Sequence, residues 1–472
     1  MNRIYLTPET SRILSKTIKI GVPVAFQSAL VAILALADVL MVGNFGKEAT
    51  AAVGLASKWH FVAIMIMAGL STASSILVAQ YWGKGDRNTT KAVTLIAART
   101  GVWILIPVTA TFIIFSDYIL NLQTRDIDVI ALGSDYLIYA SPVLILTHLV
   151  IVLESTLRST GDSFSPLVIA AITIVINISL NYCLINGIYT LEPMGVAGAA
   201  LATTISRAMQ IIIFLGYLEF REHWLKNTDI NNLNVKGLHK KYVSLAIPAV
   251  SGAVLWAIGT MLYQVIFGHM GTLELAVFST LGPFESLCFS LFFGLSVACS
   301  VIIGQHLGRA EFNDAQAVSR LFTKTFAILG IVTTVILLVF QPWFLSALGL
   351  DTPDYTLLSK PAMTLLSIAV SLKMLNMVII NGILRAGGEN KFCLQMDFIA
   401  TWMFGLPFTA VSAFIFNLSF EKVYAIMLLE EVIKLILCWR RYKQNFWLKN
   451  LTDPASMSLR ISSKTEADSE LR

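Results

Sequence analysis

Long apolar runs recur along the chain, and they constrain its fold more than any other feature. From Ile18 to Trp439, short polar breaks separate these runs. Each is roughly 20 residues long, enough for a helix to cross the ~30 Å hydrocarbon core of a membrane. Of the 472 residues, 56% are hydrophobic and 13% are charged, a balance that suits lipid. The runs are continuous, whereas barrel strands are short and alternate. We therefore predict an all-α membrane protein.

The runs predict about twelve transmembrane helices in two groups of six. The first group covers residues 18–42, 51–80, 92–115, 130–155, 164–188 and 194–217. The second group covers residues 243–267, 273–304, 317–340, 357–383, 392–416 and 419–439. The predicted domains are a cytoplasmic N-terminus (1–17), an N-lobe (18–217), an interlobe linker (218–242), a C-lobe (243–439) and a cytoplasmic tail (440–472).

Basic residues are concentrated in alternate connections between these runs. Lys84, Arg158 and Lys241 are among many on one side, whereas the other side has few, such as Lys47 and Arg125. This is the positive-inside pattern, and it predicts that both termini are cytoplasmic. The net charge of +5 is then explained by topology and contact with lipid headgroups, so we expect no nucleic-acid partner.

The two groups of six are copies of one unit. Pro23 matches Pro248 at a spacing of 225, and the same spacing takes Gln80 to Gln305 and Gly83 to Gly308. Farther along, LRSTGD (157–162) matches LRAGGE (384–389) at a spacing of 227. Because six is even, both copies enter the membrane from the same side, so the repeat is parallel. Parallel repeats with a cavity between them suit alternating access.

Several motifs together resemble the multidrug and toxic compound extrusion (MATE) family. They are GVPVAFQ, ADVLMVGNFG, GLSTASSILVAQYWGKGD, LRSTGDSFSP, NISLNYCLINGI and MGVAGAALATTISR. The resemblance implies two six-helix lobes around a central V-shaped cavity, and export of cationic drugs against protons or sodium ions. The chain looks most similar to the branch named after a DNA-damage-inducible protein. Trp256 and Met374 stand where the sodium-coupled bacterial branch has a glutamate and an aspartate.

Asp38 is the strongest candidate for ion coupling. A charged group in a span costs about 2.5–3.5 kcal/mol on insertion scales, and Asp38 has only apolar neighbours in sequence. The resemblance places the family's N-lobe ion-site aspartate here, accompanied by Asn177, Asn181 and Thr203. The i, i+4 spacing of the two asparagines puts them on one helix face. Tyr136 is a further candidate for this network.

The identity of the coupling ion stays open. Sodium could bind at Asp38, Asn177 and Asn181, but some relatives have an aspartate at the second asparagine, and a hard cation favours carboxylate oxygens. Glu285 could supply a carboxylate in the C-lobe, where it takes the repeat position of His60. The alternative interpretation is that these polar groups only hydrogen-bond neighbouring helices.

Aromatic side chains in the spans could line a cavity for an organic cation, because ring faces attract positive charge. The candidates are Trp59, Trp256, Tyr263 and Phe284, although aromatic residues also simply pack. Other charged residues in the spans are expected to be interhelical partners or to lie near the interface. These are Arg99, Glu154, Lys373, Asp397, Glu430, Glu431 and Lys434.

Other function classes lack their motifs. The chain contains no GxxxxGK[ST], HExxH or GxSxG, which argues against an ATP-driven pump or a membrane enzyme. The five cysteines show no CxxC spacing, so we expect no dedicated metal site and no cofactor. We predict a monomeric secondary antiporter that exports organic cations such as drugs. The alternative is a lipid-linked saccharide flippase of related fold, which would favour basic cavity residues.

Overall fold

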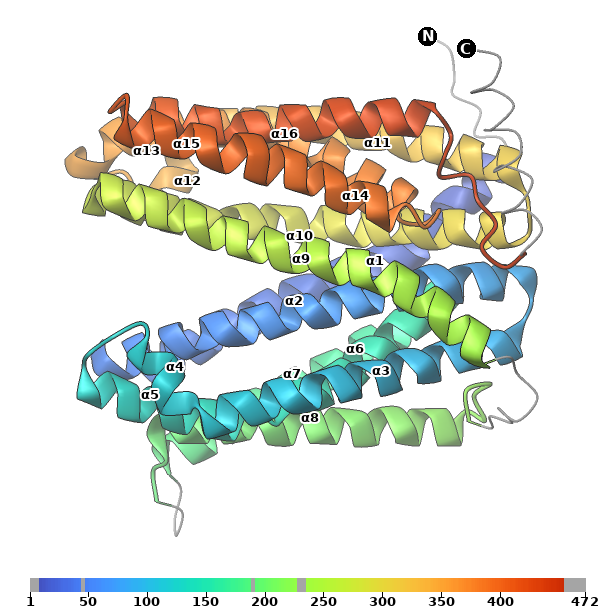
Figure 1. Ribbon diagram of the computed structural model, residues 1–472, viewed down its shortest axis with the longest axis horizontal. Coiled ribbons are helices and arrows are strands. Elements are labelled where there is room, and N and C mark those ends of the chain that lie inside the picture. The colour runs from blue at the N-terminus through green and yellow to red at the C-terminus, as the bar shows by residue number, and fades with distance from the viewer. Residues whose placement is uncertain (1–7, 44–46, 188–191, 227–234, 454–472) are drawn as a thin grey trace. The chain divides into compact units, whose positions relative to one another are not determined.

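The computed structural model describes residues 8–43, 47–187, 192–226 and 235–453, and all regular elements in these ranges are helices (Figure 1). The first half contains α1 (Pro8–Gly43), α2 (Lys47–Lys84), α3 (Arg87–Ile114), α4 (Ser116–Asn121), α5 (Ile127–Ala140), α6 (Val143–Thr160), α7 (Phe164–Asn186) and α8 (Gly195–Phe220). The second half contains α9 (Val235–Met270), α10 (Thr272–Gly308), α11 (Phe312–Val339), α12 (Gln341–Ala347), α13 (Pro353–Met377), η1 (Val378–Leu384), α14 (Asn390–Asp397), η2 (Phe398–Gly405), α15 (Leu406–Phe414) and α16 (Phe420–Lys443). The elements η1 and η2 are π-helical.

The helices confirm the predicted fold class. Among the described residues, ten are long and apolar enough to cross a membrane, and α10, bent by 43° between Ser290 and Phe292, makes eleven. Helix α16 is not among these helices, because of its composition. Its 24 residues give it the length of a span, but it carries Glu430, Glu431 and Lys434 within its apolar stretch. The chain is thus a multi-span membrane protein.

Three predicted spans differ in detail from the structure. The span predicted at 130–155 is divided into α5 and α6 at Ser141 and Pro142, because proline lacks the N–H that a continuous helix needs. The spans predicted at 357–383 and 392–416 each contain a π-helical segment, η1 and η2. Such segments insert an extra residue into a turn and often mark functional positions.

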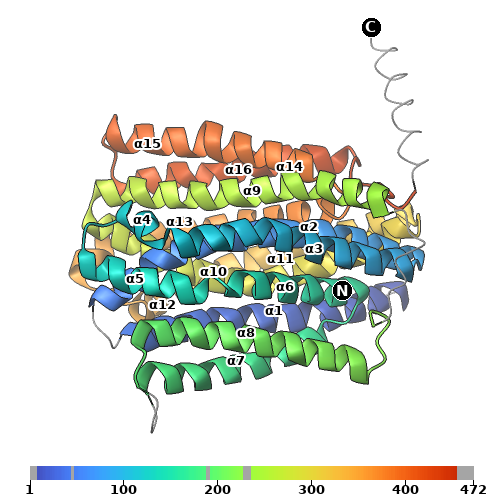
Figure 2. The same ribbon diagram turned by 60° about the horizontal axis from the view of Figure 1, so that its bottom comes forward.

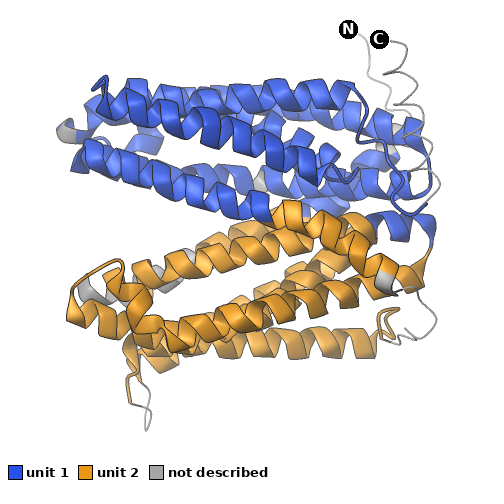
Figure 3. Ribbon diagram, in the orientation of Figure 1, with its two compact units in different colours: residues 1–22, 79–85, 251–472 blue, residues 23–78, 86–250 orange. Residues whose placement is uncertain are grey.

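The chain divides into two compact units, and several boundaries between them fall inside helices (Figure 3). Unit 1 contains residues 1–22, 79–85 and 251–472, and unit 2 contains residues 23–78 and 86–250. The boundaries therefore cut α1, α2 and α9 rather than following the repeat. In unit 2, the start of α9 packs on α2, where a Cβ added to Gly69 would lie 2.4 Å from the Val250 Cα.

Within unit 1, α2 and α10 cross at the repeated glutamines and glycines. A Cβ added to Gly83 would lie 2.2 Å from the Gln305 carbonyl oxygen. The equivalent Cβ on Gly308 would lie 1.9 Å from the Gln80 carbonyl oxygen. The two contacts are related by the repeat, and both need glycine because backbone atoms of the two helices touch. The glutamines and glycines that recur in the sequence therefore also contact each other in the structure.

A short segment after α16, residues 444–453, packs against the same helix ends, and we call it the C-terminal strap. The Gln80 side chain, which is fully buried, donates to the Ala386 and Lys449 carbonyls at 2.9 and 3.3 Å and accepts from the Leu451 N–H at 2.7 Å. Trp447 is also fully buried, with its carbonyl against Gly387. The strap thus joins the end of α2 to α14 and α16.

Candidate functional site

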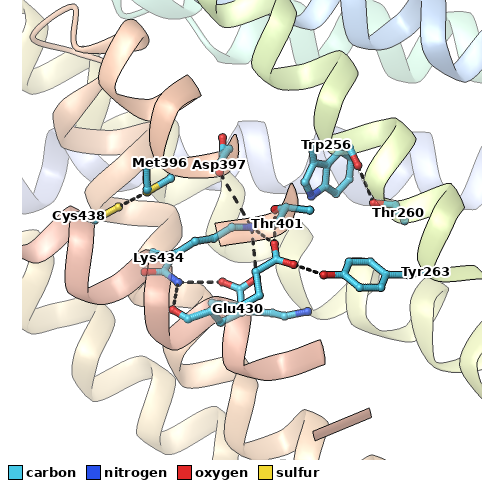
Figure 4. A network of polar contacts seen from close by, with 12 residues as sticks. Trp256, Thr260, Tyr263, Met396, Asp397, Thr401, Glu430, Lys434 and Cys438 are labelled. Atoms are coloured by element: carbon cyan, nitrogen blue, oxygen red, sulfur yellow. Dashed lines mark hydrogen bonds and ion pairs between the residues drawn. The ribbon is translucent and has the colours of Figure 1, made fainter. Parts of the chain in front are cut away.

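The largest group of buried charges in the described residues lies in unit 1 around Lys434 of α16. Its ammonium nitrogen is 2.5 Å from Glu430 Oε1, 3.9 Å from Glu431 Oε1 and 4.0 Å from Asp397 Oδ1. The helix period explains part of this arrangement, because residues at i−4 and i−3 share a face with Lys434. Asp397 comes from the end of α14. Figure 4 shows Asp397 and Glu430 converging on Lys434.

Neutral donors complete the shell of this cluster. Glu430 accepts hydrogen bonds of 2.5 Å from the Thr401 hydroxyl on one oxygen and from the Tyr263 hydroxyl on the other. Asn376 of α13 donates to the Glu431 carboxylate at 2.8 Å. Charge-assisted bonds of this kind are stronger than neutral ones. The Glu430 carboxylate is therefore held in place by helices α9, η2 and α16 together.

The π-helical turn η2 allows Thr401 and Tyr263 to come close to Glu430. It carries Thr401 and ends at Gly405, where a Cβ would lie only 2.1 Å from the Tyr263 hydroxyl and 2.6 Å from Glu430 Oε2. A side chain at this position would displace one of the two partners. The glycine at the end of η2 is thus a requirement of the site.

The cluster carries more negative than positive formal charge. Three carboxylates, Asp397, Glu430 and Glu431, surround one ammonium group, which leaves a formal charge of −2. The neighbouring Glu285 of α10 is paired with Lys373 of α13 and adds nothing to this sum. Arg385 lies close enough to Asp397 to offset part of its charge. When Arg385 is included, three carboxylates face two cations, so the carboxylates still outnumber the cations by one.

That excess has a chemical consequence. An uncompensated buried charge costs several kcal/mol, so the cluster favours uptake of a proton or another cation. The side chains of Glu430 and Lys434 are 8% and 7% exposed, so little water is present to screen the excess negative charge.

A second polar group, predicted from the sequence, lies in unit 2 between α7 and α8. These helices run side by side (Figures 1 and 2). Asn181 donates to Asn177 at 3.1 Å, and Asn177 donates to Ser206 at 3.1 Å and Thr203 at 3.4 Å. Gly198 allows this close approach, because its Cβ would lie 2.6 Å from the Leu184 carbonyl oxygen. The structure thus brings Asn177, Asn181 and Thr203 together.

Asp38 lies in α1, but its side chain is outside the described residues. Met41, one turn later, packs in the same apolar group as Tyr136 of α5 and Ile185 of α7. This part of α1 therefore lies beside the asparagine helix. Tyr136 also lies near the buried His60 of α2, with ring centres 6.0 Å apart. The His60 Nε2 atom has no hydrogen-bond partner among the described residues.

The remaining predicted residues lie in separate surroundings. Glu285 forms an ion pair with Lys373, and Phe284 packs against Phe344 with ring centres 5.2 Å apart. Trp59 packs edge-on to Phe112 in unit 2, and Trp256 is 48% exposed. Tyr263 is buried, and its hydroxyl rather than its ring face meets the Lys434 cluster.

Sequence reasoning treated the members of the Lys434 cluster as separate interhelical partners and did not assemble them into a site. One signal was available: Glu430, Glu431 and Lys434 follow an i, i+1, i+4 pattern inside an apolar run. Such a pattern is costly in a membrane unless the charges meet each other. Asp397 and Thr401 lie about 30 positions earlier, and only the fold shows that they join.

Known proteins match almost the whole chain. The sequence model of the family described as MatE matches residues 23–183 and 248–411. The chain is 26% identical over 437 residues to the probable multidrug resistance protein YoeA of Bacillus subtilis, covering 91% of this chain and 93% of the relative. It is also 26% identical over 412 residues to the probable multidrug resistance protein NorM of Agrobacterium fabrum, covering 84% and 86%. Among solved structures, the Vibrio cholerae MATE transporter VcmN in its bent form superposes with a TM-score of 0.84 at 19% identity, covering 94% of this chain and 99% of that one.

Proposed function

The chain belongs to the MatE family of multidrug efflux transporters, and from this premise we propose that it exports organic cations in exchange for protons. It is a transporter and not an enzyme. We propose that it works as a monomer in a bacterial inner membrane, with both termini in the cytoplasm. The proposed N-lobe, C-lobe and linker follow the repeat, at residues 18–217, 243–439 and 218–242.

The observation that carries this proposal is the excess of carboxylates around Lys434. A membrane-embedded group that lacks a positive charge will take up either a proton or a cationic substrate. The two compete, because each satisfies the same deficit. Competition for one negative site is what an antiporter needs, since the carrier then crosses loaded with one cation or the other. Glu430, Glu431 and Asp397 are the groups that would bind the proton.

A proton suits this cluster better than a sodium ion does. Sodium requires several oxygen ligands around a free position, whereas the centre of the cluster is occupied by the Lys434 ammonium group. Both oxygens of Glu430 already accept hydrogen bonds from Tyr263 and Thr401. Sodium remains the alternative in unit 2, where Asp38, Asn177 and Asn181 are proposed as a second coupling site and Thr203 and Tyr136 as its neighbours.

The test is ethidium efflux from proteoliposomes under an imposed pH gradient and, separately, an imposed sodium gradient. We would compare wild type with Glu430→Gln, which keeps the side-chain shape but removes the titratable group, and with Asp38→Asn. Glu421→Gln, which makes the same change at a partly buried position in the first turn of helix α16, is the matched control. Thermal melting would show that each variant is folded.

We expect Glu430→Gln to lose most pH-driven efflux and to bind ethidium more weakly, because it removes one negative charge from the cluster. Glu421→Gln should behave as wild type. Full pH-driven efflux by Glu430→Gln would refute coupling at the Lys434 cluster. Loss confined to Asp38→Asn would move coupling to unit 2. If wild type exports no cation under either gradient, the flippase alternative takes precedence.

A further inference from the structure

An apolar pocket of about 550 Å³ lies in unit 1. Helices α9, α14, η2 and α16 form its walls. The apolar lining includes Leu255, Phe392, Leu394, Phe398 and Leu437, and the polar side chains in it are Ser251 and Gln395. A volume of this size accommodates a drug-sized molecule.

Asp397 connects this pocket to the charged cluster. Its neighbours in sequence, Met396 and Phe398, both line the pocket. A Cβ added to Gly252, next to the lining residue Ser251, would lie 3.9 Å from Asp397 Oδ2. Its other oxygen, Oδ1, faces Lys434 at 4.0 Å. Asp397 is not itself a lining residue, so its carboxylate lies beside the pocket wall and next to the cluster, and its side chain is 18% exposed.

We propose that this pocket binds a lipophilic organic cation, with Asp397 as its counter-charge. The inference rests on the proposed cation export and gives it a specific substrate site. The apolar walls would hold aromatic or alkyl groups, because burial of apolar surface is favourable. The excess negative charge around Asp397 selects a cation over a neutral molecule of the same shape.

The position of Asp397 also explains why a proton and a cation would exclude each other. Lys434 is shared among Asp397, Glu430 and Glu431, so the charge on each affects the others. A cation in the pocket would compensate Asp397 and leave Lys434 to the two glutamates. A proton on the cluster would remove the deficit that holds the cation. One lysine thus links the pocket to the protonation site.

The experiment measures equilibrium binding of tetraphenylphosphonium to the purified, full-length protein in detergent. Triphenylphosphine oxide, which is neutral and similarly aromatic, is the comparison probe. Ser251→Phe and Leu437→Phe would fill the pocket from two different helices, and Asp397→Asn would remove its charge. Leu262→Phe, on α9 but outside the pocket lining, is the matched control for adding a ring to this helix.

We expect both filling variants to weaken tetraphenylphosphonium binding at least fivefold and Leu262→Phe to leave it unchanged. Asp397→Asn should weaken it about tenfold, a modest loss for an ionic contact in partly buried surroundings, without changing binding of the neutral probe. Wild-type affinity in all three pocket variants would overturn the inference. Equal binding of both probes, insensitive to Asp397→Asn, would also overturn it and show that the pocket takes a lipid chain.

These outcomes separate this inference from the proposed function. Gradient-driven export that survives in Ser251→Phe and Leu437→Phe would leave the transporter proposal intact and place the substrate elsewhere. Pocket-dependent binding without export under any ion gradient would leave the site intact and refute the antiport.

Discussion

The crossing of α2 and α10 predicts a destabilising effect of the smallest possible substitution, glycine to alanine. The carbonyl oxygens that face Gly83 and Gly308 would lie 2.2 and 1.9 Å from a new Cβ. A normal contact needs ~3.5 Å, so the backbones must separate by about 1.3 Å and 1.6 Å respectively. Neither obstacle is a flexible side chain, and a backbone shift of this size typically costs about 1–3 kcal/mol.

Two other glycines on the same helices provide matched controls. A Cβ added to Gly54 of α2 or Gly282 of α10 meets nothing within 4 Å. There the change should stabilise the helix by up to about 1 kcal/mol, because alanine is the better helix former. Thermal melting of detergent-purified protein should therefore show opposite shifts, lower for Gly83→Ala and Gly308→Ala, higher or unchanged for the controls. If all four variants melt alike, the close crossing is wrong.

Three further substitutions probe the polar contacts. Lys434→Met should destabilise the protein by about 3–5 kcal/mol, because it leaves Glu430 without its cation; recovery of the melting temperature in the double variant with Glu430→Gln would identify the lost charge as the cause. Asn177→Ala should cost about 1–3 kcal/mol through the hydrogen bonds it removes, measured by melting against Ser179→Ala on the exposed face of α7. Gln80→Leu should release the C-terminal strap, because it removes the hydrogen bonds of Gln80 to Lys449 and Leu451. Limited proteolysis at the end of α16 should then be faster, and an unchanged cleavage rate would contradict this.

The fold was largely predictable because its main determinants are local or periodic. Apolar runs long enough to span a membrane predict helices without tertiary information. The repeat was visible in Gln80, Gln305, Gly83 and Gly308. These residues recur because each of the two crossing helices needs a glycine where it meets the backbone of the other. The division of the span at 130–155 was less predictable, since Pro142 can either kink or end a helix.

The site was predictable where one helix supplies most of it. Asn177 and Asn181 share a face by spacing alone, and Thr203 joins them across a tight helix pair. The Lys434 cluster combines α9, α14, η2 and α16, and only two of its acidic groups come from the same helix as the lysine. The sequence suggested a cation contact for the ring of Tyr263 and gave no signal for the hydrogen bond that its hydroxyl donates to Glu430.

The C-terminal strap shows how an apolar signal can be overlooked in a polar segment. Residues 440–472 were predicted to be a cytoplasmic tail. Within this segment, Trp447 and Leu451 are buried, and the polar side chain that fixes them, Gln80, lies far away in sequence. Residues from 454 onward lie outside the described part of the chain, so the cytoplasmic location of the tail stays a prediction.

The charge count around Lys434 also predicts how export should respond to membrane voltage. With Arg385 included, the cluster lacks one positive charge, so it can hold one proton or one monovalent cation at a time. Exchange of one for the other moves no net charge, whereas an additional proton would add about 2.3 kcal/mol of driving force per 100 mV. Export of a monovalent cation at a fixed pH gradient should therefore not respond to voltage.

Proteoliposomes with the potential clamped by potassium and valinomycin allow this to be measured directly. The export rate of ethidium at a constant pH gradient should be the same at zero and at about −100 mV. The compartment that receives protons is the one whose potential is made negative. If the ethidium export rate rises under that potential, a second coupling ion enters this compartment in each cycle. The polar group of α7 and α8, beside the helix that carries Asp38, would then be its site, and Asp38→Asn should abolish the voltage response while leaving pH-driven exchange through the Lys434 cluster. A voltage response that survives Asp38→Asn would instead show that the cluster itself takes up two protons, as its charge without Arg385 would allow.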